Sequence, residues 1–408
     1  MTPRSLVGVL SRALAEMSPS DRVAAALPAR PPRPMTAPVS VIAIGKAAPA
    51  MTVGALRRWD RHVADVLIVT PDGTDATAVA RDRRVEVLRA GHPVPDRRSM
   101  DAADRCLTRA RVRSVEGGSL LALVSGGASA LVCAPAVGIR LEDKQAVTRA
   151  MLASGASIHD INVIRKHLSR IKGGGLARAA RPAPVMTLVV SDVIGGTIAD
   201  VGSGPTVGDT STVARARRLL ARHAPDYAGL PLVTTGPANN VVSARMVASP
   251  EELAKRIARA LRERGLRVRV LEPSLDTFDE LAQAYVALAS RLRPGTALVR
   301  AAEPSVELPI ARTPTGRGGR STHLAARVGL ELPRGTTFLA AATDGVDGSS
   351  GAAGAIVDGT FRDRVGESAI VHALERFDTG PLHRAANSAL PERPTGHNLA
   401  DLHVLLRP

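Results

Sequence analysis

Residues 119–139 have the sequence SLLALVSGGASALVCAPAVGI, which contains no charged residue. The run is long enough to cross a membrane, but Gly126, Gly127 and Pro135 lie inside it and would break a spanning helix. We therefore interpret it as a buried strand, Leu120–Val124, followed by a glycine turn and the start of a helix. A buried strand that leads into a helix is typical of a parallel sheet covered by helices on both faces.

Similar apolar runs, rich in β-branched residues, occur on both sides of this segment, and amphipathic stretches follow most of them. The other strand candidates in this half are Val41–Ile44, Val66–Thr70, Val85–Leu88 and Val185–Val190. The alternation predicts a mostly parallel, Rossmann-like sheet. In such sheets ligands bind at the carboxyl ends of the strands, so the loops there are the first places to examine.

A softer boundary near residues 224–230 introduces a second region with the same alternation. Helices are expected over residues 250–264 and 276–292. Strands are expected at Leu232–Thr234, Val268–Leu271, Ala297–Val299, Thr337–Ala341 and Leu402–Leu406. Because 408 residues exceed one ordinary domain, we predict two α/β domains, residues 1–230 and 231–408.

The formal net charge of +16 raises the question of a nucleic-acid partner. Only five of the 54 basic residues are lysines, and the arginines are spread over a chain that is also rich in proline. Aromatic residues make up 2%, too few to supply stacking platforms for single strands. We therefore expect no nucleic-acid partner and no membrane partner, and the sequence leaves a homodimer open.

Cys106 and Cys133 show neither a CxxC pattern nor a Cys/His spacing suited to a metal. Both are expected to be buried thiols of a reduced, cytoplasmic protein. The first residues form an amphipathic helical pattern interrupted by Arg12 and Glu16, which does not match a signal peptide.

Three strand ends in the first region carry residues suited to chemistry. Lys46 follows the strand Val41–Ile44 directly, where a lysine can add charge to an anion site at a helix start. Ser125-Gly126-Gly127-Ala128-Ser129 can cradle a phosphate through backbone N–H groups and hydroxyls, although a tight buried turn remains the alternative. Asp192 is placed as a Mg²⁺ ligand or as a base for a hydroxyl, with a turn-forming aspartate as the alternative.

The segment 162–175, NVIRKHLSRIKGGG, predicts an amphipathic helix that ends at three glycines. Arg165 lies beside its apolar stripe, and we expect this flank, with Lys172, to contact phosphate. The alternative is a basic face that only contacts solvent. His167 is expected to have a structural role.

Two glycine loops in the second region carry further charged residues. Arg317 and Arg320 lie in TGRGGR, and arginine forks suit carboxylates or phosphates. Asp344 and Asp347 lie in TDGVDG after the strand Thr337–Ala341, where two carboxylates can hold a nucleotide or a metal. Each loop is weak evidence alone. Together they indicate anion clamps and acids at strand ends.

Taken in order, these segments resemble the glycerate 2-kinases of the MOFRL type, and the resemblance covers nearly the whole chain. The matching segments are Ile44–Ala48, Gly91–Asp96, Ser125–Leu131, Asp143–Ala150, Asn162–Gly174, Ser191–Val193, Ser203–Thr206, Gly316–Arg320 and Thr343–Gly348.

The resemblance implies two three-layer α/β/α domains with an active site in the cleft between them. It implies an ATP- and Mg²⁺-dependent kinase that phosphorylates a hydroxyl of a small hydroxy acid, by default glycerate to 2-phosphoglycerate. It further implies functional roles for Lys46 and Asp192, for an arginine among Arg317 and Arg320, and for His92 at the substrate.

The chain departs from the family pattern at several motif positions. Gly196 stands where the family has an acid, Arg300–Ala302 replaces Ser-Gly-Gly, and Ser321–His323 replaces Asn-Gln-Glu. Two alternatives therefore stay open. One is a family member that acts on a different hydroxy acid or with changed chemistry, and the other is a catalytically silent ligand-binding or regulatory homologue.

Overall fold

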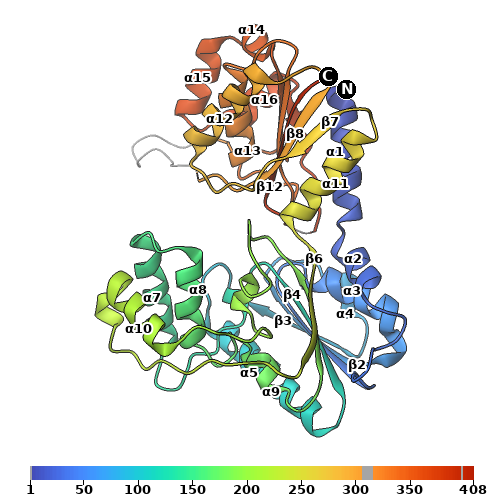
Figure 1. Cartoon of the computed structure of the whole chain (residues 1–408), viewed down its shortest axis with the longest axis vertical. Helices are drawn as coiled ribbons and strands as arrows, with labels where there is room; N and C mark the ends of the chain where they lie inside the picture. Colours follow the sequence, from blue (N-terminus) through green and yellow to red (C-terminus); the bar gives the residue numbers. More distant parts are fainter. Residues whose placement is uncertain (1, 306–315, 397) are drawn as a thin grey trace. The chain divides into compact units, whose positions relative to one another are not determined.

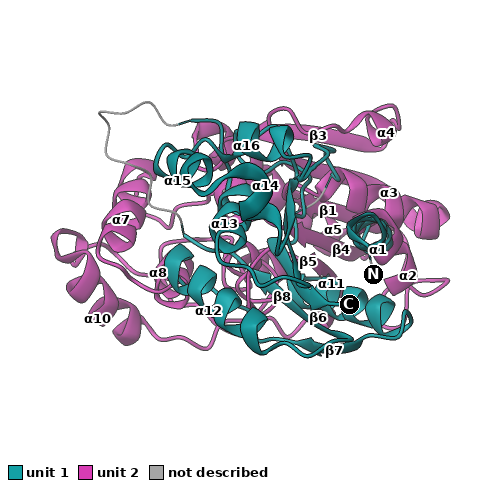
Figure 2. Ribbon diagram, turned by 90° about the horizontal axis from the view of Figure 1, so that it is seen from above, with its two compact units in different colours: residues 1–18, 248–408 teal, residues 19–247 magenta. Residues whose placement is uncertain are grey.

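The computed structural model describes residues 2–305, 316–396 and 398–408, and the chain forms two compact units. Unit 2 comprises residues 19–247, and unit 1 combines residues 1–18 with residues 248–408 (Figure 2). This division differs from the expected boundary after residue 230, because the strand β6 (Val241–Ala248) still belongs to the first sheet. The first helix, α1 (Pro3–Glu16), instead packs on α11 (Pro250–Arg262) of unit 1.

The sheet of unit 2 has six strands in the order β3-β2-β1-β4-β5-β6. Its first five strands in this order pair in parallel, as the sequence predicts. Those strands are β1 (Val39–Ile44), β2 (Val63–Pro71), β3 (Val85–Ala90), β4 (Ser119–Ser125) and β5 (Val185–Val190). Every residue of β1, β4 and β5 is buried, which explains their uninterrupted apolar sequences.

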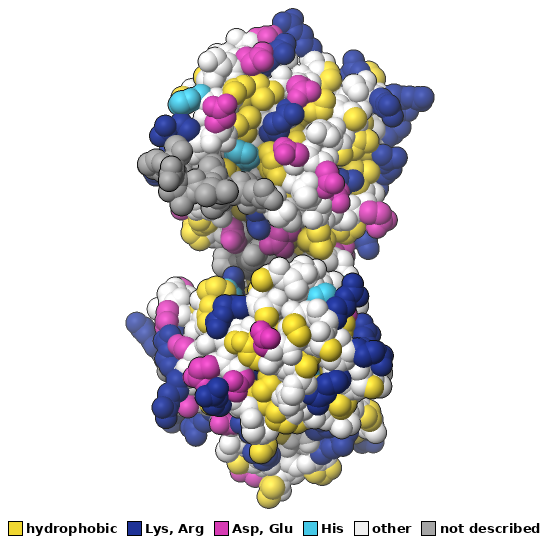
Figure 3. Space-filling model, turned by 90° about the vertical axis from the view of Figure 1, so that its left-hand side faces the viewer, with side chains coloured by type: hydrophobic (Ala, Val, Ile, Leu, Met, Phe, Trp, Pro, Cys, Tyr) yellow, Lys and Arg dark blue, Asp and Glu magenta, His cyan; other side chains and the backbone are white. Residues whose placement is uncertain are grey.

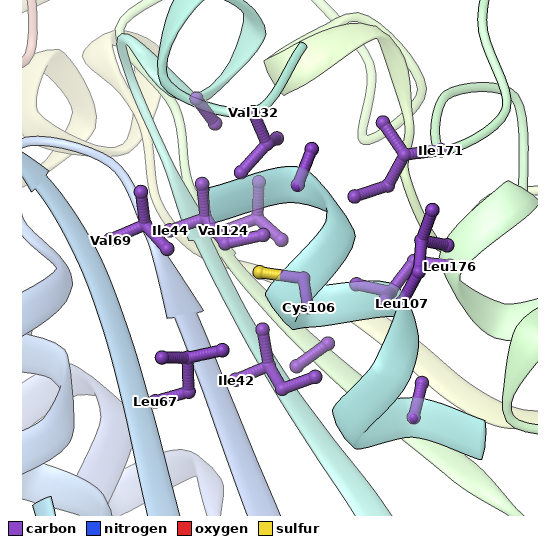
Figure 4. Close-up of a cluster of buried hydrophobic side chains, with 14 of the residues drawn as sticks. Ile42, Ile44, Leu67, Val69, Cys106, Leu107, Val124, Val132, Ile171 and Leu176 are labelled. Carbon is purple, nitrogen blue, oxygen red and sulfur yellow. The ribbon is translucent and has the colours of Figure 1, made fainter. Parts of the chain in front are cut away.

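Helices cover both faces of this sheet (Figure 1). They include α2 (Pro19–Ala26), α3 (Ala48–Trp59), α4 (Thr77–Ala80), α5 (Arg97–Val115), α6 (Ala128–Leu131) and α9 (Gly175–Ala179). The core on one face joins the central strands to α5, and Figure 4 shows Cys106 pointing from α5 towards Ile42 and Ile44. Burial raises the pKa of this thiol to about 12, so Cys106 is an apolar core residue, as predicted.

Three further helices of unit 2 enclose a separate apolar core. They are α7 (Leu141–Ala153), α8 (Ile158–His167) and α10 (Val213–His223). His167 is fully buried there, with Nδ1 2.7 Å from the Val233 carbonyl and Nε2 3.0 Å from Ser211 Oγ, so its role is structural, as predicted. Residues 232–234 form no strand; Leu232 and Val233 pack on this core instead.

The sheet of unit 1 has six strands in the order β11-β10-β9-β12-β8-β7, and it is mixed. Only β7 pairs in parallel with its neighbour β8, while β12 runs antiparallel to β8 and β9. The strands are β7 (Arg267–Val270), β8 (Thr296–Ala302), β9 (Thr337–Ala342), β10 (Gly354–Asp358), β11 (Ala389–Leu390) and β12 (Asp401–Arg407). The sequence did not predict β10 and β11.

In unit 1, α1 and α11 lie on one face of the sheet, and α12 and α13 lie on the other (Figure 1). The helices after α11 are α12 (Phe278–Arg291), α13 (Arg320–Gly329), α14 (Phe361–Val365), α15 (Glu367–Glu375) and α16 (Thr379–Ala385). Each unit therefore has the three-layer α/β/α architecture.

Basic side chains are scattered among acidic and apolar ones on the face shown in Figure 3. Many arginines also pair with a carboxylate, for example Arg84 with Asp60 and Asp82 at 2.6 Å each. Within the described part of the chain, no helix combines the length and the apolarity needed to cross a bilayer.

Candidate active site

The strand ends of unit 2 bring the predicted residues together where β1 and β4 lie side by side at the centre of the sheet. The Lys46 N–H donates to the Gly126 carbonyl at 2.9 Å, and the Ala47 N–H donates to Ser125 Oγ at 3.1 Å. These bonds tie the loop after β1 to the turn after β4. In doubly wound sheets the crevice outside such neighbouring carboxyl ends is where ligands bind.

Asp192 follows β5 and lies against the same turn. Its carboxylate is so close to Gly126 that a Cβ on this glycine would lie 2.1 Å from Oδ2 and 2.4 Å from Cγ. Only glycine therefore fits at position 126 while Asp192 keeps this place. The predicted serine–glycine turn, lysine and acid form one cluster.

His92 completes the cluster from the loop after β3. A Cβ on Gly127 would lie 3.2 Å from His92 Nε2 and 3.4 Å from Lys46 Cγ, so both side chains flank this turn residue. Gly127 has a φ of +84°, a left-handed conformation that favours glycine. Burial, and then the charge of Lys46, lower the pKa of His92 below its usual range. His92 is therefore a neutral hydrogen-bonding group at neutral pH.

A pocket of about 460 Å³ adjoins this cluster inside unit 2. Its walls come from the strand-end loops on one side and from α7 and α8 on the other. Four cationic residues line it, and no Asp or Glu does: Lys144, Arg149, Arg165 and Lys172. The structure thus places Arg165, Lys172 and Ser129 of the predicted phosphate-binding set around one cavity.

Lys172 also fixes the shape of the turn. Its buried Nζ donates to the Ser129 carbonyl at 2.8 Å and to Ser129 Oγ at 3.1 Å. Ser129 Oγ in turn lies 3.2 Å from Ser203 Oγ. Lys172 therefore positions the segment that follows the glycines, in addition to lining the cavity.

Lys144 and Arg149 of α7 were not predicted as site residues from the sequence. Lys144 is 6% exposed, and its Nζ has no hydrogen-bond partner in the described structure. Both residues lie in the segment DKQAVTRA, where charged residues at helical spacing usually indicate a solvent-exposed face. Two signals were available: the scarcity of lysine in this arginine-rich chain and the match of Asp143–Ala150 to the family pattern.

Arg320 lies in unit 1 at the first residue of α13. Its Nη1 is 3.1 Å from Glu303 Oε1, and its Nε is 3.2 Å from Asp401 Oδ2. Burial raises the pKa of Asp401 to about 7, although the charge of Arg320 acts in the opposite direction. The predicted anion-binding arginine is thus held by two carboxylates of its own unit.

Arg317 is exposed in the loop before α13, and its guanidinium makes no hydrogen bond within the described residues. The loop itself is fixed, because the Arg317 N–H donates to Asp378 Oδ1 at 2.8 Å and its carbonyl accepts from the Gly380 N–H. This geometry leaves the side chain available to an external anion.

Asp347, predicted to bind nucleotide, instead caps α13. It is 3% exposed and accepts the Ser321 N–H at 2.9 Å and the Thr322 N–H at 2.8 Å. Each carboxylate oxygen thus accepts a backbone N–H from the first turn of α13, where the N–H groups have no hydrogen-bond partner within the helix. Asp344 accepts the Val346 N–H at 3.0 Å within its own turn and remains partly accessible.

The departures from the family pattern have local structural partners. The Arg300 guanidinium lies 5.6 Å from the centre of the Tyr285 ring, a cation–π distance. His323 packs between Phe278 and Phe377, with ring centres 4.6 and 4.7 Å away, and burial lowers its pKa to about 4. Near Gly196, Asp200 accepts the Thr197 N–H at 2.9 Å and so stabilises its own loop.

The donor set for a metal is sparse. Within the described ranges, no group of three or more His, Cys, Asp or Glu side chains is arranged to hold a metal ion. Asp192 is the one predicted ligand at the strand-end cluster. A site with one carboxylate suits Mg²⁺, which is commonly held by one or two carboxylates together with substrate phosphates and water.

Comparison with known proteins covers both units. A family model described as a domain of unknown function, DUF4147, matches residues 5–230, and the MOFRL family model matches residues 296–401. Two proteins of Agrobacterium vitis are provisionally named hydroxypyruvate reductases. One is 34% identical over 90% of this chain and 98% of its own length, and the other is 35% identical over 98% of this chain and 93% of its own length.

A protein named D-glycerate 2-kinase from Thermotoga maritima is 31% identical over 90% of this chain and 90% of its own. The crystal structure of a glycerate kinase from the same organism covers 100% of both chains, with a TM-score of 0.86 and 28% identity.

The fold and these relatives define a small-molecule kinase built from two α/β units. More narrowly, the chain belongs to the glycerate 2-kinase family that carries the MOFRL domain, as the sequence resemblance indicated.

Proposed function

We propose that this kinase transfers the γ-phosphoryl group of ATP, with Mg²⁺, to a hydroxyl of a small hydroxy acid, with glycerate as the default acceptor and 2-phosphoglycerate as the product. The observation that supports this most is the convergence of Lys46, the Ser125–Ser129 turn and Asp192 beside a pocket lined by four cationic residues and no acid. Phosphoryl transfer needs positioning and charge neutralisation more than covalent participation by the protein.

In this proposal the acceptor hydroxyl oxygen attacks the γ-phosphorus, a new P–O bond forms, and the bond to the β-phosphate oxygen breaks to release ADP. Asp192 orients the hydroxyl and accepts its proton; alternatively, Asp192 would hold Mg²⁺, and the proton would pass to solvent. Mg²⁺ held there would supply positive charge against the phosphates. Lys46 neutralises charge on the transferring group or on the acid's carboxylate, and the N–H groups of the glycine turn bind phosphate oxygens.

His92, with its lowered pKa, offers a neutral hydrogen bond to the acceptor without adding charge. Arg317 and Arg320 supply guanidinium groups for anionic oxygens of the substrates. The exposed guanidinium of Arg317 fits this role directly, whereas Arg320 would share its charge with Glu303 and Asp401.

An ADP-release assay with Mg-ATP and D-glycerate tests the proposal. We expect turnover that Lys46→Ala lowers by roughly 10²- to 10³-fold, because a cation at a developing charge is lost. Lys255→Ala, on an exposed face of α11, is the control and should retain full activity. Folded wild-type protein without turnover, or an unchanged Lys46→Ala variant, would overturn the assignment.

The same preparation separates the alternatives. A panel of hydroxy acids with Mg-ATP identifies a different acceptor if another acid reacts faster than glycerate. Hydroxypyruvate with NADH or NADPH tests the reductase activity in the provisional name of the Agrobacterium relatives. A silent homologue would bind nucleotide or acid in calorimetry and release no product.

A further inference from the structure

The pocket beside the strand-end cluster contains buried positive charge that has no negative partner within unit 2. Lys144 is 6% exposed, Lys172 is 2% exposed, and Arg165 lies beside them. Burial lowers the pKa of all three side chains, and for Lys172 the neighbouring charges of Lys144 and Arg165 lower the pKa further. No carboxylate contributes to any of these shifts.

The three cations do not have equivalent surroundings. The Nζ of Lys172 donates to main-chain carbonyls and to Ser129 Oγ, which compensates part of its burial. The Nζ of Lys144 has no hydrogen-bond partner in the described structure, although it lines the cavity. Burying an ammonium group without a hydrogen-bond acceptor costs desolvation free energy, and an anion bound in the cavity would supply the acceptor and the negative charge that the protein itself does not provide.

Other residues that line the cavity are apolar. Pro93, Val94 and Pro95 line it from the loop after β3, and Leu152 lines it from the end of α7. Val94 is 57% exposed and Leu152 is 60% exposed, so two apolar side chains lie at an open rim. The cavity thus has two buried lysines in its interior, and its exposed lining residues are Pro93, Val94, Leu152 and one cation, Arg149. Its volume is that of an ordinary ligand site.

We propose that this cavity binds the ATP donor, with Lys144 as a phosphate-binding residue beside Arg165 and Lys172, and with the base against Val94 and Leu152. The inference rests on the proposed kinase function and adds the place and the recognition residues of the donor. A small hydroxy acid would use the cations but not the apolar rim, which is why the geometry favours a nucleotide. Gly127 and Ser129 line the same cavity, so the terminal phosphate would lie towards Lys46 and Asp192.

The test measures binding, so that it is separate from turnover. Calorimetric titrations of the full chain with ADP, tripolyphosphate, adenosine and D-glycerate are compared for wild type and Lys144→Met. Loss of one charge-assisted contact should weaken ADP and tripolyphosphate by roughly 10- to 100-fold and leave adenosine unchanged. Lys255→Met removes an exposed lysine in unit 1 and should bind ADP like the wild type.

A second pair of variants examines the rim without disturbing a buried residue. Leu152→Glu places a negative charge at the mouth and should weaken ADP at least tenfold, whereas Val115→Glu, at an 88% exposed position on α5, should have no effect. This pair keeps the inference testable if Lys144→Met fails to fold.

The outcomes separate this inference from the proposed function. Weakened glycerate binding with unchanged ADP binding in Lys144→Met would assign the cavity to the acid and overturn the inference, even if the protein is an active kinase. ADP binding unaffected by both Lys144→Met and Leu152→Glu would also overturn it. ADP binding that depends on Lys144, in a protein without turnover, would support the inference while the proposed function fails.

Discussion

Replacing Gly126 with alanine is expected to disable the strand-end site while the fold persists. The added Cβ would lie 2.1 Å from Asp192 Oδ2, whereas ordinary contacts begin at 3.4 Å, a difference of 1.3 Å (3.4 minus 2.1). Either the carboxylate or the turn must move by about this distance. Because a displacement of about 1 Å at a reacting group can cost about 10²-fold in rate, we expect kcat to fall by roughly that factor.

The assay is ADP release at saturating Mg-ATP and acceptor, together with thermal unfolding. Overpacking at this contact should cost about 1–3 kcal/mol of stability, which is small enough for a folded variant. Gly229→Ala is the matched control in the same unit, because nothing lies within 4 Å of a Cβ there. It should leave both kcat and the melting temperature near the wild-type values.

The effect of Gly126→Ala should also depend on Asp192. In an Asp192→Ala background the carboxylate that clashes is absent, so adding Gly126→Ala should cause little further loss of kcat, and the two effects should not add. Full activity of Gly126→Ala in the wild-type background would refute the reasoning. So would an equal loss in both backgrounds, because the clash with Asp192 could not then be the cause.

Three further predictions concern unit 1. Asp347→Ala should lower the free energy of unfolding by about 1–2 kcal/mol, because the cap of α13 is lost, and the KM for ATP in the kinase assay should stay unchanged. A raised KM for ATP at unchanged stability would instead favour the nucleotide-binding role expected from the sequence. Arg317→Ala should raise KM for the acid without changing the melting temperature, whereas Arg320→Ala, which leaves Asp401 buried without its cation, should lower both the melting temperature and kcat. His383 is buried, and its pKa is lowered to about 4. As the pH falls, the unfolded chain therefore binds a proton at this histidine before the folded protein does, and the free energy of unfolding should fall by about 2 kcal/mol between pH 7 and 5. In urea titrations the free energy of unfolding of His383→Gln should depend less steeply on pH, and an unchanged slope would contradict this account.

The sequence predicted the central strands well because burial on both faces requires continuous apolar runs, as in β1, β4 and β5. Edge strands lack this requirement. Half-exposed β6 carries Arg245 and was missed, and so was the two-residue strand β11. The β-branched run Leu232–Thr234 looked like a strand, but its leucine and valine pack on the core enclosed by α7, α8 and α10, since local hydrophobicity does not specify a partner.

The site shows the same contrast. Lys46, the Ser125–Ser129 turn and Asp192 were found because each directly follows a recognisable strand, and parallel strands bring their carboxyl ends to one edge. Asp347 looked equally suitable in its glycine loop. Its actual partners are the first N–H groups of α13, and a one-dimensional pattern does not reveal this contact.

Two α/β units and the kinase family follow from local properties of the chain, because apolar periodicity marks the strands and helices and the ordered glycine-turn motifs mark the family. Only the tertiary structure decided which charges are exposed to solvent and which are buried. Lys144 belongs to an ordinary amphipathic pattern, yet helix packing within unit 2 places its ammonium group in a cavity lined by other cations and by no described Asp or Glu. Such a placement depends on contacts between residues far apart in the chain.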